Sequence, residues 1–83
     1  MSSEDRSNDA ESGGASLRSV YVNGEGREVK GGTTVAQLVE SLGRDPRTVA
    51  VELNGLIVPR DRYDFVSLQE GDRLEIVHFV QGG

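Results

Sequence analysis

Residues 33–43, TTVAQLVESLG, decide the fold more directly than any other stretch. Thr34 stands where a helix N-cap is expected, and Gln37 three positions later completes a capping-box sequence. Gly43 is a natural helix stop. Four apolar residues recur with the spacing i, i+3, i+4 and i+7 of one helix face: Val35, Leu38, Val39 and Leu42. The stretch therefore predicts a single short helix whose apolar stripe must pack against another layer.

The segment after this helix predicts a hairpin. Asp45-Pro46 keeps the helix from resuming, because proline does not fit a helix interior. Residues 48–59, TVAVELNGLIVP, then place Asn54-Gly55 between two apolar runs, a strong hairpin signal. Pro59 ends the second strand or sets it at a sheet edge. Three apolar residues of the first strand point to one side: Val49, Val51 and Leu53.

The segment before the helix predicts another hairpin. In residues 19–23, SVYVN, Val20 and Val22 alternate with polar or aromatic residues, as in a half-buried strand. NGEG at 23–26 is a turn signal, since Asn and Gly tolerate positive φ. A short second strand is expected from Arg27 to Lys30, and Gly31-Gly32 ends it.

The chain after Pro59 is harder to interpret. For residues 60–68, RDRYDFVSL, we expect a loop or short helical turn that tucks Phe65, Val66 or Leu68 under the core. QEGD at 69–72 is a turn, and RLEIVHFV at 73–80 is the last strand.

The last strand has two faces and runs straight into Gln81, Gly82 and Gly83. If Leu74 and Ile76 enter the core, Val77 and Phe79 face outward. Exposed apolar groups beside the chain end often mark a partner surface. The sequence is equally compatible with a second arrangement, in which the Phe79 side chain folds back over an edge of the sheet.

The predicted element order is β-β-α-β-β-β, which indicates an α+β fold of the ubiquitin-like β-grasp type. One main helix packs on one face of a mixed sheet of four to five strands. We expect residues 1–16 to be a disordered acidic tail, 17–80 the β-grasp domain and 81–83 a flexible Gly-Gly tail. Residues 1–16 hold four acids and one base, and their composition cannot support a core.

Composition excludes several functions. The 83 residues contain no cysteine, so neither a thiolate metal site nor a cysteine nucleophile is available. His78 is the only histidine, and no catalytic triad, metal set or phosphate loop can be assembled. The net charge of −5 does not suit nucleic-acid binding, and no apolar run is long enough for a membrane span. We therefore expect a cytoplasmic protein that is not an enzyme and has no bound cofactor.

The final Gly82-Gly83 is the chemically distinctive feature. Without side chains, this end can adopt backbone angles closed to other residues and pass through a narrow channel. Its carboxylate is sterically bare. These properties suit a carboxylate that another enzyme activates.

Five segments resemble the ThiS family, the sulfur-carrier proteins of thiamine biosynthesis: VNGEGREV, TTVAQLVESLG, VAVELNGLIVPR, EGDRLEIV and the final GG. The likeness covers the chain from about Val20 to Gly83, and NGLIVPR is the most specific internal piece. The acidic N-terminal extension is additional to the usual family pattern.

The resemblance implies a mechanism. A ubiquitin-activating-like adenylyltransferase uses ATP to adenylate the carboxylate of Gly83. A sulfur donor, such as a cysteine desulfurase or rhodanese-type protein, converts it to a thiocarboxylate, and thiazole synthase takes the sulfur. By the same likeness, Gly82 and Gln81 thread into the partner site. Five residues are expected to form the docking surface: Phe79, Val77, Leu56, Pro59 and Arg60.

Other functions stay open. A small subunit of molybdopterin synthase, or a carrier serving another metabolite, would use the same chemistry. A ubiquitin-like modifier would be attached to lysines through the terminal glycine. Residues 51–77 also resemble an S4 RNA-binding pattern, but the preceding helix lacks the expected basic residues.

Overall fold

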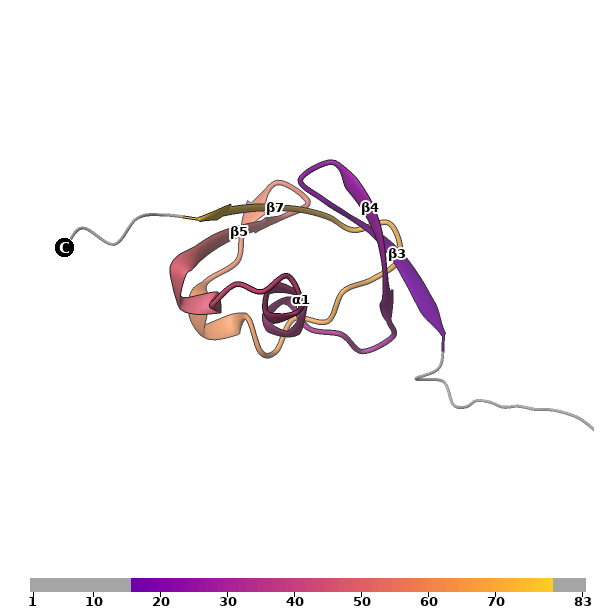
Figure 1. The fold of residues 1–83 in the computed structure, drawn as a ribbon, viewed down its shortest axis with the longest axis horizontal. Helices are drawn as coiled ribbons and strands as arrows, with labels where there is room; N and C mark the ends of the chain where they lie inside the picture. The colour runs from indigo at the N-terminus through magenta and orange to yellow at the C-terminus, as the bar shows by residue number, and fades with distance from the viewer. Residues whose placement is uncertain (1–15, 79–83) are drawn as a thin grey trace, which may run out of the picture.

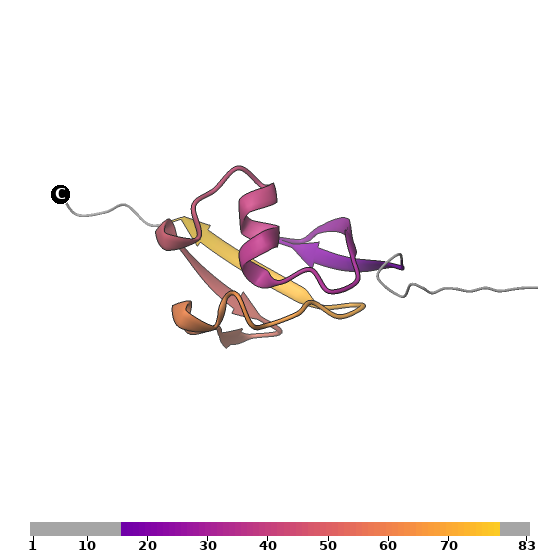
Figure 2. The same ribbon diagram turned by 90° about the horizontal axis from the view of Figure 1, so that it is seen from below.

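A mixed five-stranded sheet curves around one α-helix in the computed structural model, which describes residues 16–78 (Figure 1). The strand order is β4-β3-β7-β5-β6; β3 and β7 are parallel and the other neighbours antiparallel. The helix lies across one face of the sheet (Figure 2), so the predicted β-grasp is confirmed. In chain order the elements are β3 (Leu17–Val22), β4 (Glu25–Lys30), α1 (Val35–Ser41), the 3₁₀ helix η2 (Pro46–Thr48), β5 (Val49–Leu53), β6 (Leu56–Ile57), the 3₁₀ helix η3 (Arg60–Arg62) and β7 (Arg73–His78).

Two predicted segments lie almost entirely outside the described residues. They are the acidic N-terminal segment, of which only Ser16 is described, and the C-terminal segment at 81–83. Both stay predictions.

The helix α1 begins and ends where its sequence predicts. The Gln37 backbone N–H donates to Thr34 Oγ1 at 3.2 Å, and the Thr34 N–H donates to Gln37 Oε1 at 3.0 Å. These reciprocal bonds satisfy two groups that a helix start leaves unpaired. Gly43 takes φ +79° after the last turn, which ends the helix. The stripe is buried at Val35, Leu38 and Val39, and partly buried at Leu42.

Both Asn-Gly turns form as predicted. Asn23 and Gly24 have φ of 51° and 84°, and Asn54 and Gly55 have 52° and 86°. Positive φ at both central residues matches the twist of two-residue hairpins. The turns fix two registers, Val22 opposite Glu25 and Leu53 opposite Leu56.

The connection between β6 and β7 completes the core, but not with all the expected residues. Leu68 is fully buried and Val66 packs against the core, whereas Phe65 is 76% exposed. The expectation that Phe65, Val66 or Leu68 reaches the core is thus confirmed by Leu68 and Val66, while Phe65 stays outside it. Phe65 lies in the turn after η3, where its N–H donates to the Arg62 carbonyl at 2.8 Å. The chain then bridges from Ser67 to Thr34, which places Val66 and Leu68 on one side of this short extended stretch.

Tyr63 takes the inward place that the sequence did not indicate. It is 4% exposed, and its hydroxyl donates to the Val49 carbonyl at 3.0 Å. The tyrosine thus fills core space while its polar end is satisfied.

Candidate functional site

The central strand β7 leads to the C-terminal segment and has the two faces predicted for it. Leu74 and Ile76 are buried against the helix side, while Val77 is 60% exposed on the other. Phe79, the next residue predicted to face outward, lies outside the described residues. β7 is held by β3 on one edge and by β5 on the other. The start of the C-terminal segment is therefore anchored in the middle of the sheet.

Asn23 continues the pairing of β7 after β3 has ended. Its Oδ1 accepts from the Ile76 N–H at 2.7 Å, and its Nδ2 donates to the Ile76 carbonyl at 3.1 Å. The Asn23 N–H also donates to the Leu74 carbonyl at 2.8 Å. One turn residue thus acts as an additional strand position, and its side chain holds β7 two residues before the strand ends.

The outer face, meaning the sheet surface opposite α1, collects apolar side chains near the end of β7. Val77 lies opposite Ala50. The Val58 N–H donates to the Val51 carbonyl, which extends the β5–β6 register by one pair, and alternation then turns Pro59, the next residue, to the outer face. Ile57 pairs with outward-facing Glu52 and is 66% exposed, so it shares this surface. We call these residues the apolar row: Ala50, Ile57, Pro59 and Val77.

An acidic pair borders the apolar row. Glu52 on β5 lies directly opposite Glu75 on β7, both on the outer face. Like charges in direct cross-strand positions destabilise a sheet. Further along the same face, the Arg73 guanidinium lies 5.2 Å from the centre of the Tyr21 ring. The apolar surface thus has a rim that carries both charge signs.

The described residues offer few features of an enzyme site. Asp45 accepts side-chain and backbone hydrogen bonds from Arg47, which lower the pKa of this exposed carboxyl to about 2. This arrangement caps η2. Between residues 16 and 78, no group of three or more His, Asp or Glu residues is placed to hold a metal ion. In that same range, no helix has the length and apolar character needed to cross a membrane.

Comparison with known proteins identifies the family. The ThiS family matches residues 20–83, which include the sheet from the second half of β3 onward and the final Gly-Gly.

The chain belongs to the ThiS family.

Individual relatives agree with this assignment. A thiazole synthase of Magnetococcus marinus is 45% identical over 64 residues, which cover 77% of this chain but only 20% of that protein. The chain thus spans about a fifth of that relative's length. The sulfur carrier protein ThiS of Thermus thermophilus is 41% identical over 69 residues and is covered to 98%. The crystal structure of ThiS from Geobacter metallireducens superposes with a TM-score of 0.64 at 32% identity, covering 78% of this chain and 99% of that one.

The residues predicted to dock this ThiS chain are only partly brought together. Val77 and Pro59 share the apolar row, but Leu56 does not. Leu56 pairs with inward-pointing Leu53, so it lies on the helix side of the sheet edge, where it is 74% exposed. Arg60 begins η3 and lines a separate hollow beside Asp64.

Ile57 and Ala50 are the members of the apolar row that the docking prediction did not include, and Ile57 is the more exposed of the two. The signal was present, because a two-residue Asn54-Gly55 turn sets Leu53 opposite Leu56 and hence Glu52 opposite Ile57. The predicted activation site at Gly83 and the threading residues Gly82 and Gln81 lie outside the described residues. Their roles stay predictions.

Proposed function

We propose that this chain is a sulfur carrier protein of thiamine biosynthesis whose reactive group is the carboxylate of Gly83. The observation that carries the proposal is the family match, which continues through the sheet to Gly83 itself. The carrier of Thermus thermophilus, covered over nearly its whole length, supports the same function. The protein then acts as a substrate of other enzymes in the cytoplasm.

The proposed chemistry begins with activation. A carboxylate oxygen of Gly83 attacks the α-phosphate of ATP on a ubiquitin-activating-like adenylyltransferase, and pyrophosphate leaves. The persulfide of a cysteine desulfurase or rhodanese-type protein then attacks the acyl carbon through its outer sulfur and displaces AMP. A protein thiol cleaves the S–S bond of the resulting acyl disulfide, and that thiol ends in a disulfide with the donor cysteine. The product is a thiocarboxylate, whose sulfur is a nucleophile. ATP serves only in the partner, and we expect no cofactor bound to the carrier.

The apolar row supports a docking role for the outer face. Ile57 and Val77 are more than half exposed, and Val77 lies two residues before Phe79 in the sequence. A partner that takes in residues 81–83 must come close to this end of β7. Burial of such side chains contributes about 1.5–3 kcal/mol each, enough to position the end of the chain.

Thiazole synthase is the proposed acceptor of the sulfur. Proteins named thiazole synthase in two organisms contain a segment 45% and 48% identical to this chain over 64 residues. Joining the two sequences in one protein is consistent with their working together.

Intact-mass spectrometry tests the proposal. The purified chain is incubated with ATP, an adenylyltransferase from the same organism and a sulfide source, and the expected product gains the mass of one oxygen-to-sulfur exchange. A chain lacking Gly83 should fold normally and gain none. Isopeptide adducts on lysines would instead indicate a protein modifier, and an unchanged yield without Gly83 would contradict the proposal.

A further inference from the structure

The two edges of the sheet differ in how well they are protected from pairing with another strand. The edge strand β6 is only two residues long, and Pro59, which has no N–H to donate, follows it closely. Short edge strands and prolines both discourage strand addition. The opposite edge strand, β4, runs for six residues without a proline. Its backbone is therefore the better template for a further strand.

The register of the first hairpin determines which backbone groups of β4 are already paired. The two-residue turn makes Val22 and Glu25 a hydrogen-bonded pair. Just beyond the other end of β4, the Gly31 N–H donates to the Ser16 carbonyl at 2.8 Å. Hydrogen-bonded positions alternate along an antiparallel pair. The odd-numbered residues of β4 thus bond to β3, and the even-numbered residues turn their backbone groups to the open edge.

The open edge of β4 has donors and acceptors that the described chain does not use. Its even-numbered residues are Gly26, Glu28 and Lys30. Among the backbone groups that they direct outward, only the Lys30 carbonyl has a partner within residues 16–78, the Thr33 N–H at 3.0 Å. A carbonyl has a second lone pair and can accept again. A strand laid along this edge would therefore find an alternating set of groups to bond.

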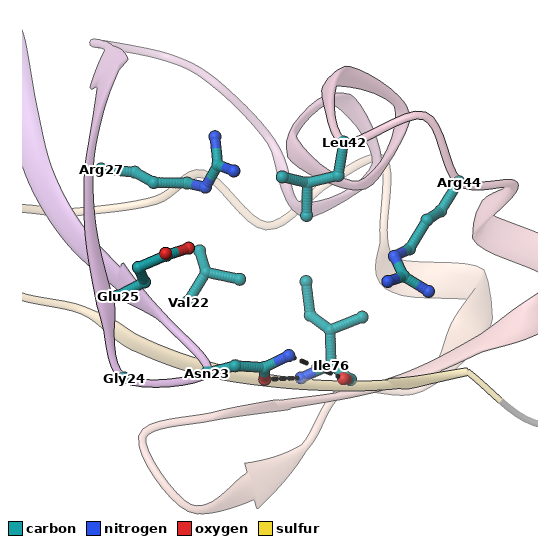
Figure 3. Close-up of a pocket in the computed structure, with 8 residues that line it drawn as sticks. All are labelled: Val22, Asn23, Gly24, Glu25, Arg27, Leu42, Arg44 and Ile76. Carbon is teal, nitrogen blue, oxygen red and sulfur yellow. Dashed lines mark hydrogen bonds between the residues drawn. The ribbon is translucent and has the colours of Figure 1, made fainter.

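The side chains of β4 alternate between the two faces of the sheet. Glu25 and Arg27 extend from β4 on the side of α1 (Figure 3). Val29 shares that side, where it is partly buried and borders a hollow of about 630 Å³ between β4 and α1. Glu28 and Lys30 lie on the outer face, both exposed, and neither has an ion-pair partner within residues 16–78. The outer face of this edge thus presents two opposite charges, spaced by two residues.

This spacing of charges is complementary to itself. In an antiparallel pair of two β4 strands centred on Val29, Glu28 lies directly opposite Lys30 of the second copy, and the two-fold symmetry repeats the pair. The open backbone groups of the same two residues face each other in this register. A pair centred on Glu28 or on Lys30 would instead set two like charges directly opposite, which is unfavourable. The charges therefore favour the register centred on Val29.

We propose that β4 is a docking strand for a second copy of this chain, and that the two copies pair in antiparallel fashion about Val29. The two sheets then join into one continuous sheet, and the exposed part of each Val29 is covered by the other. The apolar row lies on β5, β6 and β7, which β3 separates from β4, so the dimer leaves that surface open. The inference does not depend on the proposed function.

Sedimentation velocity on the full chain, from about 10 µM to about 1 mM, tests the pairing. Wild type should shift from monomer to dimer across this range. Glu28→Lys and Lys30→Glu should each weaken the association by at least about tenfold, because both symmetric pairs then carry like charges. Asp61→Lys, on the exposed surface of η3, makes the same change in net charge as Glu28→Lys and should match wild type.

Mixing the two charge variants provides the decisive comparison. The Glu28→Lys chain has two lysines at this edge and the Lys30→Glu chain two glutamates, so an equimolar mixture should dimerise although each variant alone does not. A mixture that dimerises also shows that both variants are folded.

Amide hydrogen exchange tests the register. The N–H groups of Glu28 and Lys30 should exchange more slowly as the protein concentration rises. The N–H of Gly26 should not change, because it lies opposite Gly32 of the second copy, beyond the end of that copy's β4. Three results would overturn the inference: a wild-type monomer at the highest concentration, a dimer that tolerates both charge reversals, or equal protection of Gly26 and Glu28.

Discussion

Replacing Asn23 by glycine should show how much one side chain contributes to holding β7. The substitution keeps a residue that accepts φ of 51°, so it adds no backbone strain at the turn. It removes two partly buried hydrogen bonds to the Ile76 backbone, at 2.7 and 3.1 Å. At about 1 kcal/mol each, their loss should lower the free energy of unfolding by roughly 2 kcal/mol.

This loss is large for so small a domain. A domain of roughly 60 residues has an unfolding free energy of about 3–9 kcal/mol. With an m-value near 1 kcal/mol/M, the urea midpoint should fall by about 2 M. Amide exchange at Ile76 should accelerate beyond the global change, because its N–H loses its acceptor. Asn23→Ala should cost about 1 kcal/mol more than glycine, since alanine resists the left-handed conformation.

Asn54 provides the matched control for this experiment. It occupies the equivalent turn position with φ of 52°, accepts from the Arg73 N–H at 3.0 Å and donates to Asp72 Oδ1 at 3.1 Å. Both of its bonds are exposed, so Asn54→Gly should cost only about 0.5–1 kcal/mol. Glycine's extra freedom in the unfolded chain affects both variants equally and cancels in the comparison. If Asn23→Gly costs no more than Asn54→Gly, the argument about Ile76 is refuted.

Further substitutions address the core, the outer face and pH. Leu68→Ala should lower the unfolding free energy by about 2–5 kcal/mol, whereas Phe65→Ser should change it by less than about 0.5 kcal/mol, both measured by urea unfolding. Tyr63→Phe should cost about 1 kcal/mol by leaving a buried carbonyl without its donor, and an unchanged midpoint would show that water replaces the hydroxyl. Glu75→Gln should stabilise the sheet by about 0.2–1 kcal/mol by relieving repulsion from the glutamate opposite, and a loss of stability would contradict that account. Arg47 lowers the Asp45 pKa from 3.8 to about 2, so the stability advantage of wild type over Asp45→Asn should be present above pH 4 and disappear as the pH falls to about 2, which unfolding midpoints across this range can check.

Local signals in the sequence were sufficient to predict α1 and both hairpins. A capping box at Thr34, an apolar stripe and two Asn-Gly turns each act over a few residues, and the structure follows them. The choice of Tyr63 over Phe65 for the core was different. It depends on where the chain from 58 to 72 meets the helix, through bonds such as Ala36 N–H to the Tyr63 carbonyl. No periodic pattern encodes such a long-range contact.

The candidate site was predicted unevenly for the same reason. Alternation along β7 correctly placed Val77 outward, because strand period alone determines it. Grouping Leu56 with Val77 ignored the register that the Asn54-Gly55 turn imposes, because this register places Leu56 on the helix side of the sheet.

The position of β7 determines how firmly the C-terminal segment is attached to so small a domain. An edge strand would transmit any pull on the C-terminal segment to a single neighbour, but β7 pairs on both sides. On one side β5 pairs with it over five residues, from Val49–His78 to Leu53–Leu74. On the other, the parallel contact with β3 spans only two residue pairs, and Asn23 extends it to Ile76. The strand is therefore firmly held up to Ile76 and less so at His78, where its pairing becomes one-sided. A partner that draws residues 79–83 into its site can thus open the last residue of β7 without disturbing the core, and this boundary is set by the reach of one asparagine side chain.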